Sequence, residues 1–269
     1  MNQKLIAIDL DGTTLNNHSE LTEETIQTLH ALDKQGHKIA IITGRPYRSS
    51  KEIYSKLNLG GPIANFNGAL CHIPDQPDWD GQYHITLDTD LVLDLVSFIE
   101  TLPVDYLMVE GTELMYSNTS QLPDSPYYPK DQQALLITPT TQLKEKATAV
   151  ALFSNVALQD DIKAKILNRY NHHIEVRTWG GSFPCLEVVT SGIHKAKAVE
   201  HLSRYYNIPR EDILAFGDED NDMEMIQYAG VGVAMKNGID ELKAVADVIT
   251  PFSNDENGLA KYLQDYFKL

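Results

Sequence analysis

The chain has 269 residues, 42% of them hydrophobic and 22% charged, which predicts a soluble globular protein of about two domains at ~150 residues each. Its formal net charge is −16 at neutral pH. Such a surface repels nucleic-acid backbones and anionic lipid headgroups, which argues against nucleic-acid and membrane partners. No apolar stretch approaches the ~20 residues of a membrane-spanning helix, and two cysteines make no disulfide framework, so we expect a cytoplasmic protein.

The first seventy residues alternate between apolar strands and amphipathic helices. Thr22 can cap a helix whose first turn carries Glu23 and Glu24, and Gly36 ends it. Wholly apolar strands in such alternation indicate a parallel sheet covered on both faces. The expected elements are strands at 4–10, 38–43, 63–66 and 69–73, with helices at 22–36 and 46–57.

The composition changes at residue 74, where PDQPDWDGQ predicts a linker between domains. Several short strands then follow with only two helices, which indicates an open antiparallel sheet backed by those helices. Residues 118–141 contain four prolines and little periodicity, and no element is predicted there. The expected strands are at 105–109, 113–117, 149–154, 173–179 and 185–190, and the helices at 91–102 and 160–170.

The strand and helix alternation resumes at Lys195 and continues to the end of the chain. The fold class predicted is therefore α/β, a Rossmann-like doubly wound parallel-sheet core with an inserted α+β cap domain. Residues 1–82 and 190–269 are expected to form the core, and residues 83–189 the cap. The elements expected after residue 194 are helices at 195–206, 223–229, 239–246 and from 256, with strands at 213–216, 231–234 and 247–250.

Two carboxylates, Asp9 and Asp11, directly follow the first strand. Ligand sites of open α/β sheets lie beyond the carboxyl ends of the strands, and side chains two apart on an extended segment share a face. Adjacent carboxylates repel each other unless a cation lies between them, and Mg²⁺ prefers such oxygen ligands. One of them could instead be a nucleophile, and an acidic turn without chemistry is the alternative reading.

A second acidic segment, Gly217 to Asp222, follows the strand at 213–216. Asp218 is best placed to join Asp9 and Asp11 on one metal ion. Asn221 can hydrogen-bond a phosphate or orient a lysine, whereas Asp222 could cap the next helix or support the metal site.

Neutral and positively charged groups that could bind an anion occur at two further boundaries between predicted elements. Thr43 and the Gly44 N–H can cradle a phosphate at a helix N-terminus, and Arg45 can bind phosphate or an acidic neighbour. Lys195 and Lys197 open the helix after the insert, but they point roughly 200° apart, so at most one faces the site. Two solvated surface lysines are the alternative.

Together, Asp-x-Asp-Gly-Thr at 9–13, Thr-Gly-Arg at 43–45, Lys195 and Gly-Asp-x-x-Asn-Asp at 217–222 resemble the haloacid dehalogenase superfamily of phosphatases. The large insert between the second and third motifs is similar to that of the Cof-type sugar-phosphatase branch. So are three flanking segments, Asn-Gly-Ala at 67–69, Gly-Val-Gly-Val-Ala-Met at 230–235 and Glu-Asn-Gly at 256–258.

The resemblance implies Mg²⁺-dependent hydrolysis of small phosphate monoesters, such as sugar phosphates, through an aspartyl phosphate. Asp9 would be the nucleophile, and Asp11 would protonate the leaving alcohol, activate water and give its backbone carbonyl to Mg²⁺. Asp218 would hold the metal with Asp9. The phosphate-binding groups would be Leu10 (backbone), Thr43, Gly44, Lys195 and Asn221, although Ala196 stands where the family usually has glycine.

The cap would select the substrate, a small phosphorylated metabolite, with Glu110, Arg177, Trp179 and Glu187 as candidate polar contacts. The protein would be a monomer or homodimer. Two alternatives remain open at this point: a sugar phosphomutase of the same superfamily, and a non-catalytic metabolite-binding homologue.

Overall fold

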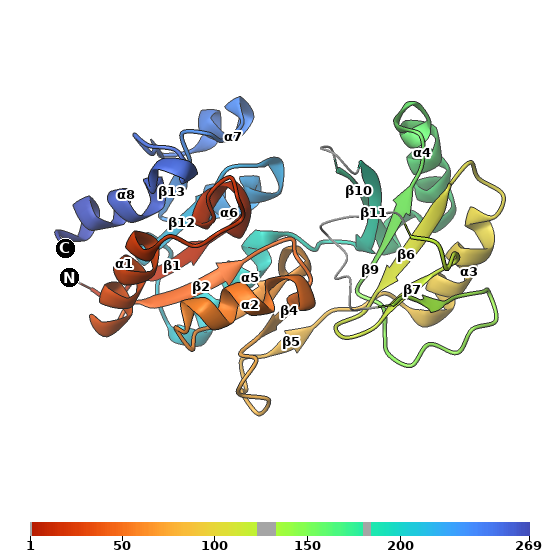
Figure 1. Ribbon diagram of the computed structural model, residues 1–269, viewed down its shortest axis with the longest axis horizontal. Coiled ribbons are helices and arrows are strands. Elements are labelled where there is room, and N and C mark those ends of the chain that lie inside the picture. Colours follow the sequence, from red (N-terminus) through yellow and green to blue (C-terminus); the bar gives the residue numbers. More distant parts are fainter. Residues whose placement is uncertain (1, 123–132, 180–183) are drawn as a thin grey trace. The chain divides into compact units, whose positions relative to one another are not determined.

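A computed structural model describes residues 2–122, 133–179 and 184–269. The chain divides into two compact units (Figure 1). The first contains residues 1–46, 50–84 and 194–269, and the second contains residues 47–49 and 85–193.

The first unit is built on an eight-stranded sheet in the order β14-β13-β12-β1-β2-β3-β4-β5. Six neighbouring strands, from β14 to β3, are parallel. Beyond β3, β4 pairs antiparallel with β3, and the edge strand β5 pairs antiparallel with β4. Segments from both ends of the chain meet at the centre, where β1 pairs with β12 (Figure 1). The strands are β1 (Leu5–Ile8), β2 (Lys38–Ile42), β3 (Ile63–Asn65), β4 (Leu70–His72), β5 (Tyr83–His84), β12 (Ile213–Gly217), β13 (Val231–Ala234) and β14 (Val248–Ile249).

Helices cover both faces of this sheet. Leu5 and Ala7 belong to one buried cluster with Val199 of α5, while on the opposite face Phe216 packs its ring against Tyr262 of α8. All residues of β1 are fully buried, as expected for a central strand with two covered faces. The doubly wound α/β prediction is therefore confirmed. The helices are α1 (Glu23–Lys34), α2 (Tyr47–Leu57), α5 (Lys195–Tyr206), α6 (Met223–Tyr228), α7 (Asp240–Val245) and α8 (Gly258–Phe267).

The second unit contains a six-stranded sheet in the order β10-β11-β9-β6-β7-β8. Its strands are β6 (Tyr106–Glu110), β7 (Met115–Ser117), β8 (Leu135–Leu136), β9 (Ala149–Phe153), β10 (Ile174–Trp179) and β11 (Cys185–Thr190), with helices α3 (Thr89–Ile99) and α4 (Gln159–Tyr170). Leu152 and Val188 share a buried cluster with Leu95 of α3 and Ile162 of α4, so both helices pack on one face.

Two expectations about the strands need correction. The insert's sheet is mixed, because β8 runs parallel to β7 within the segment for which no element was predicted. Residues 74–90 are more than a linker, since they contain Trp79, which is 9% exposed, and the edge strand β5.

Candidate active site

Three adjacent parallel strands bring the predicted motifs to one edge of the core sheet. Asp9 follows β1, Thr43 follows β2 and Asp218 follows β12. β1 pairs in parallel with β2 on one side and with β12 on the other. The carboxyl ends of these strands therefore place residues from both ends of the sequence beside one another.

An acidic cluster, defined here as Asp9, Asp218 and Asp222, lies at this edge. One carboxylate oxygen of each residue lies within 4.8 Å of the others. Asp222 is fully buried and Asp9 is 4% exposed. Burial raises the pKa of Asp9 well above its ordinary value, and Lys195 only partly offsets that effect. Burial and the charge of Asp222 likewise raise the pKa of Asp218 to about 7.

The turn after β12 fixes the position of Asp222. Its Oδ2 accepts hydrogen bonds from the backbone N–H groups of Asp218 (2.9 Å) and Glu219 (3.1 Å). Gly217 leaves the necessary space, because a Cβ at that position would stand 2.4 Å from the Cβ of Asp222. Asp222, whose role the sequence left open, is thus both a turn-forming residue and a member of the acidic cluster.

Lys195, the first residue of α5, supplies the positive charge. Its Nζ donates to Oδ1 of Asp9 and to Oδ1 of Asp222, each at 2.6 Å, and the residue is 1% exposed. Burial alone would lower the pKa of Lys195, but the two ion pairs outweigh burial and the net pKa is raised. Lys195, rather than Lys197, therefore reaches the cluster.

The loop after β1 closes over the side of Asp218. Thr13 Oγ1 donates to Asp218 Oδ1 at 3.0 Å, and Asn237 Nδ2 donates to the Gly12 carbonyl at 2.7 Å. Gly12 has φ +71°, and a Cβ there would stand 2.0 Å from Asp218 Oδ2. This position therefore requires glycine for both its backbone conformation and the close approach.

Asp11 does not share the acidic cluster with Asp9 and Asp218. Its carboxylate is paired with Arg45, whose Nε lies 2.7 Å from Oδ2 and whose Nη2 contacts Oδ1. The side chain of Asp11 is 54% exposed. Because β1 ends at Ile8, strand alternation does not direct Asp11 toward the face of Asp9, and Asp222 takes the third place in the cluster.

The residues expected to hold phosphate surround the turn after β2. Thr43 is 1% exposed and its Oγ1 accepts the backbone N–H of Arg45 at 3.1 Å; Leu10 is fully buried. A Cβ at Gly44 would stand 3.5 Å from Asn221 Nδ2 and 3.2 Å from Oδ1 of Asn67, to which Asn221 donates at 2.9 Å. From the sequence, no role in the site was predicted for Asn67, because its Asn-Gly-Ala segment contributed only to the family resemblance.

The composition of the cluster fits a divalent cation. Three carboxylates and one ammonium leave two negative charges in a buried space, and the ligand atoms are all oxygen. Within the described parts of the chain, Oδ2 of Asp9 accepts no hydrogen bond, so this oxygen keeps its lone pairs. A bound cation would favour the ionised form of carboxyls whose pKa burial raises.

The helix-free face of the insert's sheet gathers the polar residues suggested for substrate contact. Arg177 lies directly opposite Glu187, and Trp179 Nε1 donates to Glu187 Oε2 at 3.2 Å. Burial raises the pKa of Glu187 to about 7, against the opposing effect of Arg177. Glu110 shares this face by strand register and adds to that rise.

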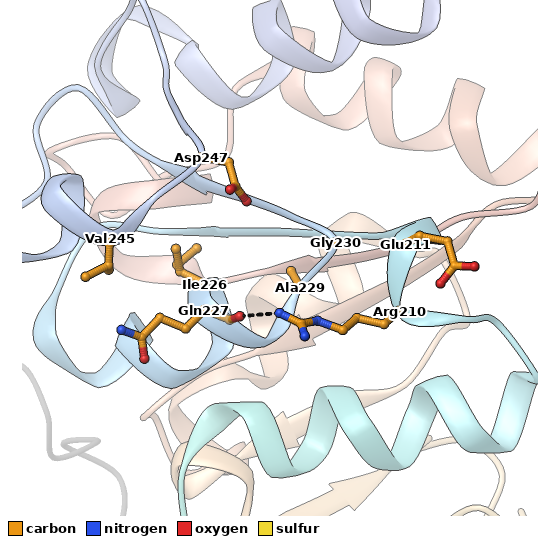
Figure 2. Close-up of a pocket in the computed structure, with 8 residues that line it drawn as sticks. All are labelled: Arg210, Glu211, Ile226, Gln227, Ala229, Gly230, Val245 and Asp247. Carbon is orange, nitrogen blue, oxygen red and sulfur yellow. Dashed lines mark hydrogen bonds between the residues drawn. The ribbon is translucent and has the colours of Figure 1, made fainter.

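A separate cavity of about 400 Å³ lies at the amino-terminal ends of strands of the core sheet (Figure 2). Its lining includes Arg210 and Glu211, which precede β12, Gly230, which precedes β13, and Asp247, which precedes β14. Arg210 donates to the carbonyls of Gln227 and Tyr228 at the end of α6. The cavity is thus remote from the carboxyl edge that carries the acidic cluster.

Comparison with known proteins agrees with this geometry. The family model of haloacid dehalogenase-like hydrolases matches residues 6–263. The chain is 38% identical over 267 residues to 5-amino-6-(5-phospho-D-ribitylamino)uracil phosphatase YitU of Bacillus subtilis (strain 168), covering 98% of each protein. It is 28% identical over 263 residues to YcsE, a phosphatase of the same name from that organism, covering 98% of this chain and 95% of YcsE.

A solved structure shows the same architecture. The crystal structure of a haloacid dehalogenase-like hydrolase from Bacteroides thetaiotaomicron matches with a TM-score of 0.84 at 25% identity, over 99% of this chain and 100% of that one. In the parts of the chain described here, no helix combines the length and apolarity needed to cross a membrane. The chain belongs to the haloacid dehalogenase-like hydrolases, in their Cof-type branch, and is a phosphatase of that family.

Proposed function

We propose that the protein is a Mg²⁺-dependent phosphomonoesterase that acts on small phosphorylated metabolites through a phosphorylated Asp9. The observation that carries this proposal is the buried acidic cluster with Lys195 between two of its members. Phosphoryl transfer depends on alignment and charge neutralisation more than on acid–base strength, and this cluster can supply both.

Asp9 and Asp218, assisted by Asp222, would hold Mg²⁺, together with the backbone carbonyl of Asp11. The ion would neutralise charge on the phosphate oxygens. Lys195 would keep Asp9 in place and compensate the charge of Asp222, at the contacts of 2.6 Å described above. Thr43, the N–H groups of Gly44 and Leu10, Lys195 and Asn221 would donate to the phosphate.

The reaction has two steps. A carboxylate oxygen of Asp9 attacks phosphorus, the bond from phosphorus to the ester oxygen breaks, and Asp11 gives that oxygen a proton. Water then attacks phosphorus while Asp11 accepts its proton, and the bond between phosphorus and Asp9 breaks to release phosphate. Arg45, paired with Asp11 through two nitrogens, would hold that carboxyl at the edge of the site for both transfers.

The substrate class proposed is a sugar or sugar alcohol with a terminal phosphate. Two relatives carry the name 5-amino-6-(5-phospho-D-ribitylamino)uracil phosphatase, so this compound is the first to assay, beside a panel of sugar phosphates. Ranking by kcat/KM identifies the preferred ester.

The test combines turnover with trapping of the intermediate. We expect phosphate release that EDTA stops and that Asp9→Asn abolishes, and borohydride reduction during turnover should convert residue 9 to homoserine, seen by peptide mass spectrometry. Turnover by Asp9→Asn would contradict the proposal. Isomerisation of a sugar 1-phosphate without phosphate release would instead indicate a phosphomutase.

A further inference from the structure

Asn67 has a buried amide nitrogen with no partner in the protein. The residue is 1% exposed, and its Oδ1 accepts the hydrogen bond from Asn221, whereas its Nδ2 donates to no atom of the described residues. Leaving a buried donor unpaired is unfavourable, and such groups are rare in native proteins. The nitrogen is therefore expected to find an acceptor from outside the chain.

The backbone around Asn67 is held in an uncommon conformation. Phe66, Asn67 and Gly68 have φ values of +51°, +55° and +92°. Positive φ is unfavourable for a phenylalanine and persists only where neighbouring contacts impose it, often at functional sites. Here the N–H of Asn67 donates to the Thr43 carbonyl at 3.0 Å, and the N–H of Phe66 donates to the Arg45 carbonyl at 3.3 Å.

These contacts direct the side chain of Asn67 to the Thr43–Gly44 turn. A Cβ at Gly44 would stand 3.5 Å from Asn67 Nδ2 and 3.5 Å from Asn221 Nδ2. The two amides thus flank the glycine whose N–H the proposed function assigns to phosphate. As a neutral donor, Asn67 would add a hydrogen bond without competing with Lys195 for the carboxylates.

We propose that Asn67 is a further phosphate-binding residue, whose Nδ2 donates to an oxygen of the phosphoryl group held by the Thr43–Gly44 turn and Asn221. The inference rests on the proposed function, which places phosphate at that turn. It assigns to Asn67 a direct contact with the substrate, in addition to its hydrogen bond with Asn221.

A double-mutant cycle separates direct binding from action through Asn221. The variants are Asn67→Gly, which tolerates positive φ, Asn221→Ala, and both together. Binding of inorganic phosphate with saturating Mg²⁺ is measured by calorimetry. Loss of one hydrogen bond to a charged group should weaken phosphate binding by about 10- to 100-fold, in the wild-type and in the Asn221→Ala background alike.

The matched control is Asn58→Gly, the same substitution at an exposed asparagine with φ +45°, which should leave phosphate affinity unchanged. Asn67→Asp provides a second variant that keeps an acceptor for Asn221 while replacing the donor, and it should weaken phosphate binding at least as much as Asn67→Gly. Thermal unfolding verifies that each variant is folded.

If Asn67→Gly has no further effect in the Asn221→Ala background, or if Asn67→Asp binds phosphate as the wild type does, the inference is overturned. A wild-type protein that binds no phosphate overturns it as well. Because calorimetry needs no turnover, these results are distinct from failure of the proposed function, which would appear as phosphate binding that depends on Asn67 without any ester hydrolysis.

Discussion

Replacing Lys195 by methionine should destabilise the core unit and slow hydrolysis. Lys195 Nζ contacts both Asp9 and Asp222 at 2.6 Å, and the residue is 1% exposed. Methionine has a comparable length but no charge, so two buried carboxylates lose their cation. Breaking a buried ion pair by removing one partner costs about 3–5 kcal/mol, and we expect a loss of this size in the free energy of unfolding without metal.

The loss should depend on pH in a defined direction. Burial raises the pKa of Asp9 and Lys195 lowers it, so the variant should hold a proton on Asp9 at a higher pH than the wild type. A carboxyl whose pKa is raised by folding stabilises the folded state at low pH, and that contribution is lost as pH rises through the folded pKa. The destabilisation should therefore be larger at pH 8 than at pH 5.

Urea unfolding in EDTA, followed by circular dichroism at both pH values, measures the effect. The matched control is Lys197→Met on the same helix, which should change stability by at most about 0.5 kcal/mol. The hydrolysis rate should fall by about 100- to 1000-fold in Lys195→Met alone. A Lys195→Met protein as stable as Lys197→Met at pH 8 would refute the assignment of Lys195 to the buried pair.

Three further predictions follow from other contacts within each unit. Gly12→Ala should lower Mg²⁺ affinity at least about tenfold by calorimetry, since the added Cβ would meet Asp218 at 2.0 Å. The control is Gly36→Ala, also at positive φ but in open space, which should cost only about 1 kcal/mol of stability. Equal Mg²⁺ affinities of the Gly12→Ala variant and the wild type would contradict this prediction. Arg45→Met should reduce kcat about 100-fold with phosphate affinity unchanged, because Asp11 loses its orienting partner, while Arg204→Met on the exposed side of α5 should leave kcat unaltered. Trp179 fluorescence in a Trp79→Phe background should titrate with a midpoint near pH 7, because Glu187 accepts its indole N–H, and the transition should vanish in Glu187→Gln. Because burial raises the pKa of Glu187, its protonated form stabilises the folded state, and this stabilisation should be lost as pH rises from about 4.5 through 7. A fluorescence profile that stays flat over this range would exclude the titration.

The core elements could be predicted because their local signals agree with the tertiary structure. β1 and β2 are uninterrupted apolar runs, and Thr22 caps α1 by accepting the N–H of Thr25 at 3.2 Å. β5 and β8 were missed because two residues are too few to show a period of two, and both lie outside the regular strand and helix alternation in which the equally short β14 was predicted. Their strand character depends on pairing with β4 and β7, which lies outside any local pattern.

The acidic cluster could be predicted only in part for a related reason. Asp9 and Asp218 follow neighbouring strands, and sheet topology alone brings them together. The cluster contains Asp222 instead of the expected Asp11 because of where the chain turns, at Gly12 and at the residues after Gly217. Asn67 was missed because an Asn-Gly pair is a common turn signal, and its contact with Asn221 joins residues 154 positions apart.

The charges around the site explain how so acidic a protein can hold an anion. Lys195 is already compensated by Asp9 and Asp222, and the nearby donors of Gly44, Asn67 and Asn221 are neutral. The local field therefore remains negative until a cation joins the acidic cluster. Under the proposed function, cation and phosphate must favour each other's binding, and by thermodynamic linkage each raises the affinity of the other by the same factor. An anion site that depends on a cation in this way can bind phosphate even on a chain whose net charge is −16.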